Sequence, residues 1–136
     1  MNHPAFRPLL NTALPHSFRY IRFERARYHD HPDGDSQTAY ILIAPLDAGS
    51  RIDSELARRH KDACRVVRRR PDREDGLGHL VHGPGGSWRF HYDIAGSTPD
   101  ETGAHFDDER FEPGEYVSIH EADGINVYRI VSVLPL

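Results

Sequence analysis

The strand predicted over residues 87–94 carries a dense set of residues that could do chemistry. Because side chains alternate between the two faces of a strand, Arg89, His91 and Asp93 share one face. A carboxylate beside an imidazole can orient it as a general base or as a metal ligand. The same pattern also fits a solvent-facing stripe with a cross-strand ion pair. The opposite face is apolar and is expected to be core: Trp88, Phe90, Tyr92 and Ile94.

A second strand, predicted over residues 115–121, could complete a pocket with the first. Its Tyr116, Ser118 and His120 fall on one face. If the two strands are neighbours, these side chains lie close to the polar face of residues 87–94. We therefore take five residues as candidate ligand-binding residues: Arg89, His91, Asp93, Tyr116 and His120.

A possible metal site lies between the first two predicted strands. His29 and His31 are two residues apart, beside Asp33 and Asp35, and imidazoles with carboxylates suit a divalent ion. The same segment is rich in turn-forming residues, which explains Asp and Gly there without a metal. We expect no cofactor, and keep a divalent metal on His29 and His31 as a possibility.

Other searches for reactive groups give little. Cys64 lies near basic residues that could lower the pKa of its thiol, but a lone cysteine at a strand start more often packs as a small hydrophobe. The sequence has no Gly-x-Ser-x-Gly elbow, and residues 83–86 form neither a P-loop nor a dinucleotide fingerprint. His79 and His82 are three apart, so on a strand they point to opposite faces.

The elements that must position these residues are mostly strands. Apolar periodicity predicts one helix, residues 50–62, with Ser50 as its N-cap. Strands are predicted over residues 17–29, 38–46, 64–70, 78–82, 87–94, 115–121 and 125–134. Asp123-Gly124 between the last two is a strong hairpin signal.

Two segments fall outside this pattern. Residues 1–16 contain three prolines and are expected to form an extended arm packed on the body. Residues 95–113 are rich in glycine, proline and acidic residues, and they form either a long acidic flap or a loop that hides a short strand near His105.

The chain is expected to form a single domain over residues 1–136. Short strands separated by turns predict a mainly β fold, an antiparallel small barrel or sandwich of about seven or eight strands. The one helix would lie between the second and third strands.

Composition and charge narrow the function. No apolar run approaches the length of a membrane span, no signal peptide is recognisable, and Cys64 alone excludes an intramolecular disulfide, so we expect a soluble cytoplasmic protein. Residues 58–73 hold eight basic and two acidic residues, while residues 93–123 hold ten acidic residues and one arginine. The net charge of −4 and the lack of aromatic residues among the arginines argue against nucleic acid.

Three functions remain compatible with the sequence. The one we favour is a non-catalytic binding module for a small ligand or a protein partner. The second is a metal-dependent enzyme with histidines and carboxylates inside the barrel. The third is an interaction module that uses the arginine-rich stretch 58–73 toward nucleic acid or an acidic partner.

Overall fold

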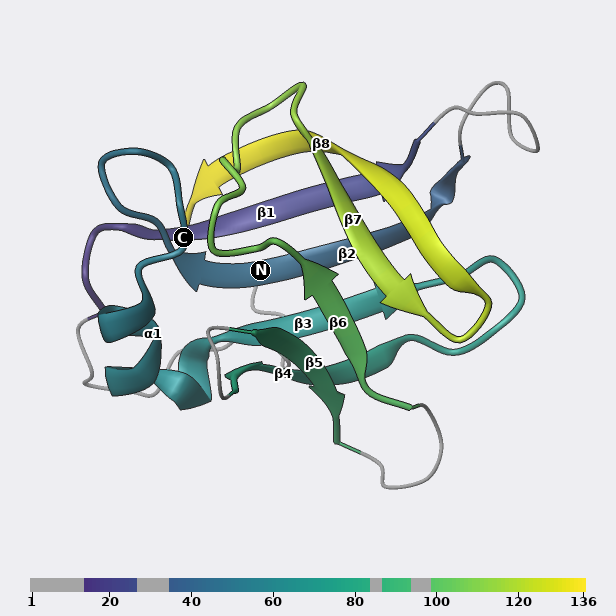
Figure 1. The fold of residues 1–136 in the computed structure, drawn as a ribbon, viewed down its shortest axis with the longest axis horizontal. Coiled ribbons are helices and arrows are strands. Elements are labelled where there is room, and N and C mark those ends of the chain that lie inside the picture. The colour runs from purple at the N-terminus through teal and green to yellow at the C-terminus, as the bar shows by residue number, and fades with distance from the viewer. Residues whose placement is uncertain (1–13, 27–34, 84–86, 94–98) are drawn as a thin grey trace.

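The protein is an eight-stranded antiparallel barrel with one short α-helix (Figure 1). The structure, a computed structural model, describes residues 14–26, 35–83, 87–93 and 99–136. Its strands are β1 (Phe18–Arg25), β2 (Asp35–Pro45), β3 (Arg65–Arg69), β4 (Gly76–His82), β5 (Trp88–Tyr92), β6 (Glu101–Ala104), β7 (Tyr116–Glu121) and β8 (Gly124–Pro135). The helices are α1 (Ser54–Arg59) and the 3-10 turn η2 (Lys61–Ala63).

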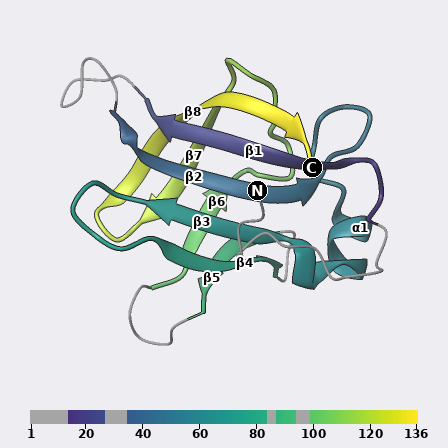
Figure 2. The same cartoon turned by 180° about the vertical axis from the view of Figure 1, so that it is seen from behind.

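Each strand pairs with the next one in the chain, and β8 returns to pair with β1 (Figures 1 and 2). The closing seam joins residues that are far apart in sequence, since Arg19 pairs with Pro135 and Arg25 with Tyr128. The predicted mainly β fold with one helix between the second and third strands is confirmed. Of the two architectures expected, the closed barrel is the one formed.

Alternation places one face of each strand in a shared interior. In β5, Trp88, Phe90 and Tyr92 are buried while the residues between them are exposed, as the sequence pattern predicts. Strand β2 is buried from Thr38 onward on both faces, as its unbroken apolar run predicts. The described interior is filled by side chains, as small barrels usually are, so a ligand must bind at an end or a gap in the wall.

Helix α1 is shorter than the predicted helix over residues 50–62. Asp53, not Ser50, is the N-cap, and its side chain accepts a hydrogen bond from the amide of Leu56. Ser50 has a positive φ of 65° and belongs to a turn in which the carboxylate of Asp47 binds the amides of Gly49 and Arg51. Ser50 therefore does not cap the helix, and its hydroxyl donates to Glu112 instead.

The predicted loop 95–113 contains a short strand, β6, which is one of the two alternatives expected for this segment. The strand covers Glu101–Ala104 and ends just before His105, which has a positive φ of 56° and begins a turn. Phe106 then folds back under the strand. A Cβ at Gly103 would lie 2.4 Å from its ring, so only glycine leaves room for it.

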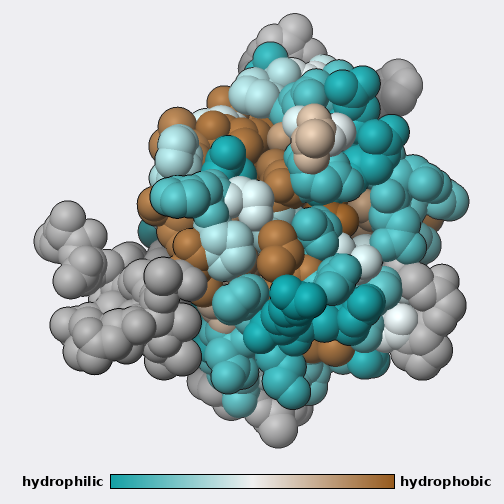
Figure 3. All heavy atoms as spheres, turned by 90° about the vertical axis from the view of Figure 1, so that its left-hand side faces the viewer, coloured by the Kyte–Doolittle hydropathy of each residue, from teal (hydrophilic) through white to brown (hydrophobic). Residues whose placement is uncertain are grey.

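The end of the barrel beside α1 is closed by apolar packing. Phe106 and Phe111 are each 1% exposed and meet edge to face, with ring centroids 5.2 Å apart. The amide of Phe111 donates to the carbonyl of Ser50, which ties this loop to the turn before α1. Viewed from this side, hydrophilic residues cover much of the surface, with hydrophobic ones showing between them (Figure 3). None of the helices described is long and apolar enough to cross a membrane.

Candidate ligand-binding site at the barrel mouth

Opposite the closed end, the interior changes from apolar to polar. Six side chains from six different strands meet there and form what we call the polar cluster. Its members are Tyr40, Arg68, Tyr92, Glu101, Glu121 and Tyr128. They meet because each lies on the inward face of its strand near the same end of the barrel.

Glu101 in β6 is one of two carboxyl groups in the polar cluster and is only 2% exposed. One of its oxygens accepts a hydrogen bond from the hydroxyl of Tyr92 and lies 2.8 Å from the hydroxyl of Tyr40. Its other oxygen forms an ion pair with the guanidinium of Arg68. Both oxygens of this buried group are therefore hydrogen-bonded, as burial requires.

Glu121 in β7 is the second carboxyl group, and its side chain is 2% exposed. Its Oε2 accepts from the hydroxyls of Tyr40 at 2.5 Å and Tyr128 at 2.7 Å. The same oxygen lies 3.3 Å from Nη2 of Arg68, and Oε1 accepts from the side-chain amide of Asn126. Arg68 thus faces two buried carboxyl groups with one positive charge.

The Tyr40 hydroxyl lies between the two carboxyl groups and has only one proton to donate. We assign that proton to the 2.5 Å contact with Glu121. The 2.8 Å contact with Glu101 is then a hydrogen bond only if Glu101 is protonated and donates to the oxygen of Tyr40. In this state Arg68 and the Glu121 carboxylate balance each other, and the polar cluster is neutral.

Burial also favours a proton on Glu101. It raises the pKa of Glu101 above its ordinary value, although the hydrogen bond from Tyr92 and the charge of Arg68 oppose it; the charge of Glu121 adds to the increase. Burial also raises the pKa of Tyr40, so its hydroxyl remains a donor. For Arg68, burial alone would lower the pKa, but Tyr40 and the two glutamates outweigh it and raise the pKa.

Above the polar cluster the barrel opens into a cavity of about 550 Å³, which we call the mouth. Its floor includes Arg68, Glu101 and Glu121, and its walls come largely from the turns at this end. The remaining lining residues are Arg25, Thr38, Arg70, Pro71, Asp72, Arg73, Pro99, Ala122 and Asp123. The volume lies within the usual range for small-molecule sites, about 300–1,000 Å³.

Arg70 and Arg73 are the cations of the mouth that the described residues leave without a carboxylate partner. The Nε atom of Arg70 is buried and has no hydrogen-bond partner among these residues. Burial lowers the pKa of Arg70, and repulsion by Arg68 and Arg73 lowers it further. An anion in the mouth would relieve both effects.

The five residues predicted to bind a ligand lie on the outer face of the barrel. Arg89 and His91 both interact with Asp100, at 3.5 and 2.8 Å, and the His91 side chain is 62% exposed. Asp93 does not orient His91; it accepts from Arg65 at 2.9 Å and pairs with His79 at 3.1 Å. The cross-strand ion pairs that were the alternative for this stripe are present.

Tyr116 and His120 are likewise exposed on β7. Strand β6 separates β7 from β5, with Thr102 paired to both Arg89 and His120. The five residues therefore share the outer face but do not gather around one cavity. Of the two cavities described for this structure, the mouth has none of the five in its lining, and the one near α1 has His91.

The metal prediction falls on residues outside the described ranges, because His29 and His31 lie within 27–34. Among the residues that the structure does describe, no group of three or more His, Cys, Asp or Glu side chains could hold a metal ion. Cys64 is fully buried, and burial raises the pKa of its thiol to about 12, so it packs as a small hydrophobe and is not a nucleophile.

Sequence patterns do not reveal the polar cluster, because its six side chains come from six strands. Alternation puts Tyr92 in an apolar face, and Glu101 falls within the predicted acidic loop. A usable signal exists: a tyrosine on an inward face needs a partner for its hydroxyl. Three such tyrosines near one end of the barrel imply buried acceptors from other strands.

This site belongs to an eight-stranded antiparallel barrel of consecutive strands with a polar mouth and an apolar closed end. Comparison with models of protein families, with curated proteins and with solved structures finds no match. Function must therefore be argued from the site itself.

Proposed function

We propose that the protein is a non-catalytic binding module that takes a small anionic ligand in the mouth of its barrel. The ligand would carry carboxylate or phosphate groups, which the guanidinium groups of Arg70 and Arg73 can bind with paired hydrogen bonds. The polar cluster would serve as a rigid floor that holds Arg68 in place.

The observation that carries this proposal is the state of Arg70. Its guanidinium borders a cavity of about 550 Å³, its Nε is buried without a partner among the described residues, and two other arginines lie near it. Arg70 is only partly buried. The Nε atoms of Arg65, Arg68 and Arg69 likewise lack a hydrogen-bond partner in the described part of the chain, but Arg70 is the one of these arginines outside the polar cluster that borders the cavity. A polar atom removed from water without a partner costs free energy. A ligand anion would supply the missing partner.

The polar cluster supports binding more than catalysis. Its carboxyl groups already bind three tyrosine hydroxyls, Asn126 and Arg68, so they have little capacity left for a substrate. All four carboxyl oxygens of this network are hydrogen-bonded, although Nε of Arg68 has no partner among the described residues. Such a network makes a site rigid, and a rigid site loses less entropy on binding.

The arginine-rich stretch also fits this function better than it fits a docking face. Along β3, Arg65 and Arg69 point outward and pair with Asp93 and Asp75, whereas Arg68 points inward. The positive charges are thus distributed over two faces of the wall. We also propose, as the sequence indicated, that the protein acts in the cytoplasm without a cofactor.

The test is calorimetric titration with citrate and with inorganic pyrophosphate, at an ionic strength held constant with sodium chloride. We expect one site that binds at least one of the two anions. Because a hydrogen bond to a charged group contributes about 1.5–3 kcal/mol, Arg70→Gln should weaken binding about tenfold or more.

Arg69→Gln is the matched control, since it removes the same charge from the adjacent position on the outer face. It should bind the anion as the unmodified protein does. Failure of both anions to bind, or equal weakening by the two substitutions, would contradict the proposal.

A further inference from the structure

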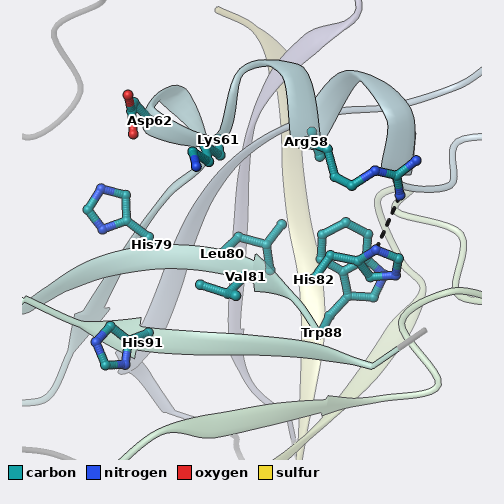
Figure 4. A pocket seen from close by; sticks show the side chains of 10 residues that line it. Arg58, Lys61, Asp62, His79, Leu80, Val81, His82, Trp88 and His91 are labelled. Atoms are coloured by element: carbon teal, nitrogen blue, oxygen red, sulfur yellow. Dashed lines mark hydrogen bonds between the residues drawn. The ribbon is translucent and has the colours of Figure 1, made fainter. Parts of the chain in front are cut away.

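A second cavity, of about 470 Å³, lies on the side of the barrel near α1 (Figure 4). It exists because β3 and β4 differ in length at this end. Their pairing ends at Arg65 with His79, and Leu80 makes one more hydrogen bond, to Cys64. Strand β4 continues to His82, and there α1 and η2 lie where a neighbouring strand would be. We call this cavity the side pocket.

The floor of the side pocket is apolar and aromatic. It is formed by Ala57, Leu80, Val81 and Trp88. The ring of His82 stacks on Trp88, with centroids 4.2 Å apart and an angle of 28° between the planes. Trp88 is 1% exposed and lies beneath the partly exposed His82 ring, so it is the His82 ring that can stack with a planar ligand.

The rim of the side pocket is basic. Arg58 and Lys61 extend over it from α1 and η2, with His79 and His91 at the other side (Figure 4). Asp62 is the one acidic residue among the described lining. A ligand with a negative group at its edge would complement this rim.

The two ring nitrogens of His82 have different surroundings. Nδ1 lies 3.4 Å from the guanidinium of Arg58, which can only donate. Nε2 is buried and has no hydrogen-bond partner among the described residues, since Asp107 lies 4.0 Å away. The His82 ring stacks on Trp88 and contacts Arg58 at the rim.

We propose that the side pocket binds a planar aromatic anion, with its ring against the His82 ring that stacks on Trp88 and its carboxylate or sulfonate at Arg58 and Lys61. This site is separate from the mouth and does not depend on the function proposed there. It differs in chemistry too, because the mouth is lined mainly by charged residues and has no aromatic ring in its described lining.

Trp88 is the only tryptophan in the chain, so its fluorescence reports on this pocket. Naphthoate should quench it and bind at one site, whereas naphthylmethanol, which has the same ring without the charge, should bind several-fold more weakly. The double substitution Arg58→Gln with Lys61→Gln should weaken naphthoate binding about fivefold, the scale expected for exposed charge contacts.

Arg59→Gln is the matched control, because Arg59 lies on the same helix, pairs with Glu55 and does not line the pocket. This variant and Arg70→Gln in the mouth should bind naphthoate unchanged. Equal affinity for the neutral ring, an unchanged affinity in the double variant, or loss of binding in Arg70→Gln would each overturn the proposal. Unfolding midpoints of all variants confirm that they are folded when they are titrated.

Discussion

The Tyr40 hydroxyl has one proton to donate, and this limits how many of the two buried glutamates can be ionised. Tyr40 lies 2.5 Å from Glu121 and 2.8 Å from Glu101, and it can donate to only one of them. If both glutamates were ionised, Arg68 would balance one charge and leave the other buried. Since an unpaired buried charge is strongly unfavourable, the fold favours a proton on Glu101.

Glutamine substitutions test this assignment. Glutamine resembles a protonated glutamic acid, so Glu101→Gln should cost less than Glu121→Gln. The carbonyl of a glutamine at position 101 still accepts from Arg68 and its amide donates to Tyr40, although the Tyr92 hydroxyl loses its acceptor. Glu121→Gln removes the only charge that balances Arg68, and breaking a buried pair typically costs about 3–5 kcal/mol. Urea unfolding at neutral pH measures both free energies of unfolding.

The two variants control for each other, because each replaces a carboxyl group by an amide at a side chain about 2% exposed. The assignment would be wrong if Glu101→Gln were as destabilising as Glu121→Gln or more so.

The proton assigned to Glu101 predicts that the stability of the fold depends on pH. Burial raises the pKa of Glu101 in the folded state above the ordinary value of about 4.3. Between the ordinary pKa and the raised pKa of the folded state, the folded protein holds a proton that the unfolded chain releases, so stability falls as pH rises. Below the ordinary value the stabilisation is fully present.

Glutamine at position 101 cannot titrate, so the Glu101→Gln variant isolates this effect. We expect the free energy of unfolding of the unmodified protein, minus that of Glu101→Gln, to decrease as pH rises above about 4.3. Denaturant unfolding across a pH series gives the difference directly. A difference that stays constant or increases would show that Glu101 is ionised in the fold.

At the residue scale, the sequence predicts on which face of a strand a side chain lies better than it predicts which residue that side chain contacts. Alternation correctly places Trp88, Phe90 and Tyr92 inward and Arg89 and His91 outward. It does not show that His91 faces Asp100, since that pairing depends on how β5 and β6 lie side by side. The chemistry of the mouth also depends on which strands lie side by side, so it could not be predicted from the sequence either.

At the scale of elements, β6 depends on one glycine. A Cβ at Gly103 would lie 2.4–2.6 Å from three ring atoms of Phe106, and real contacts are essentially never that short. Gly103→Ala should therefore displace the ring and cost about 1–3 kcal/mol, the usual effect of overpacking a core. Thermal and urea unfolding measure the loss.

A second substitution separates this clash from the general cost of changing a strand glycine. Phe106→Leu removes ring atoms that the new methyl group would meet, so the double variant should lose less stability than the sum of the single losses. Additive losses would show that Gly103 is needed for its backbone and not for the space it leaves.

The elements also show where sequence patterns fail. The hairpin signal at Asp123-Gly124 is confirmed, because β7 and β8 pair from Glu121 with Gly124, which has a φ of 121°. The N-cap prediction at Ser50 is wrong, because a turn centred on Asp47 takes the residues before the helix. Local signals compete, and the outcome depends on tertiary contacts such as that of Ser50 with Glu112.

At the scale of the molecule, closure is what the sequence could not predict. Strand number and antiparallel pairing follow from local patterns, but a barrel and a sandwich differ in whether β1 meets β8. That seam pairs Phe23 with Ile130, more than a hundred residues away, and no local signal marks it. Closure also places the six side chains of the polar cluster around one axis.

The same seam predicts how the barrel folds. Bringing distant strands together loses chain entropy before any contact compensates, so nonlocal pairs tend to form late. The hairpin of β7 and β8 is local, whereas the pairing of β8 with β1 is not. We expect the hairpin to be largely formed in the transition state and the seam to close after it.

Two isoleucines, each 0% exposed, test this order with the same chemical change. Ile119 lies in the β7–β8 hairpin, and Ile130 pairs across the seam with Phe23. Isoleucine to valine typically costs about 0.5–1.5 kcal/mol at a buried site. Ile119→Val should mainly slow folding, and Ile130→Val should mainly speed unfolding, each by roughly fivefold per kcal/mol lost. Stopped-flow fluorescence of Trp88 measures both rates, and the reverse pattern would mean that the seam forms first.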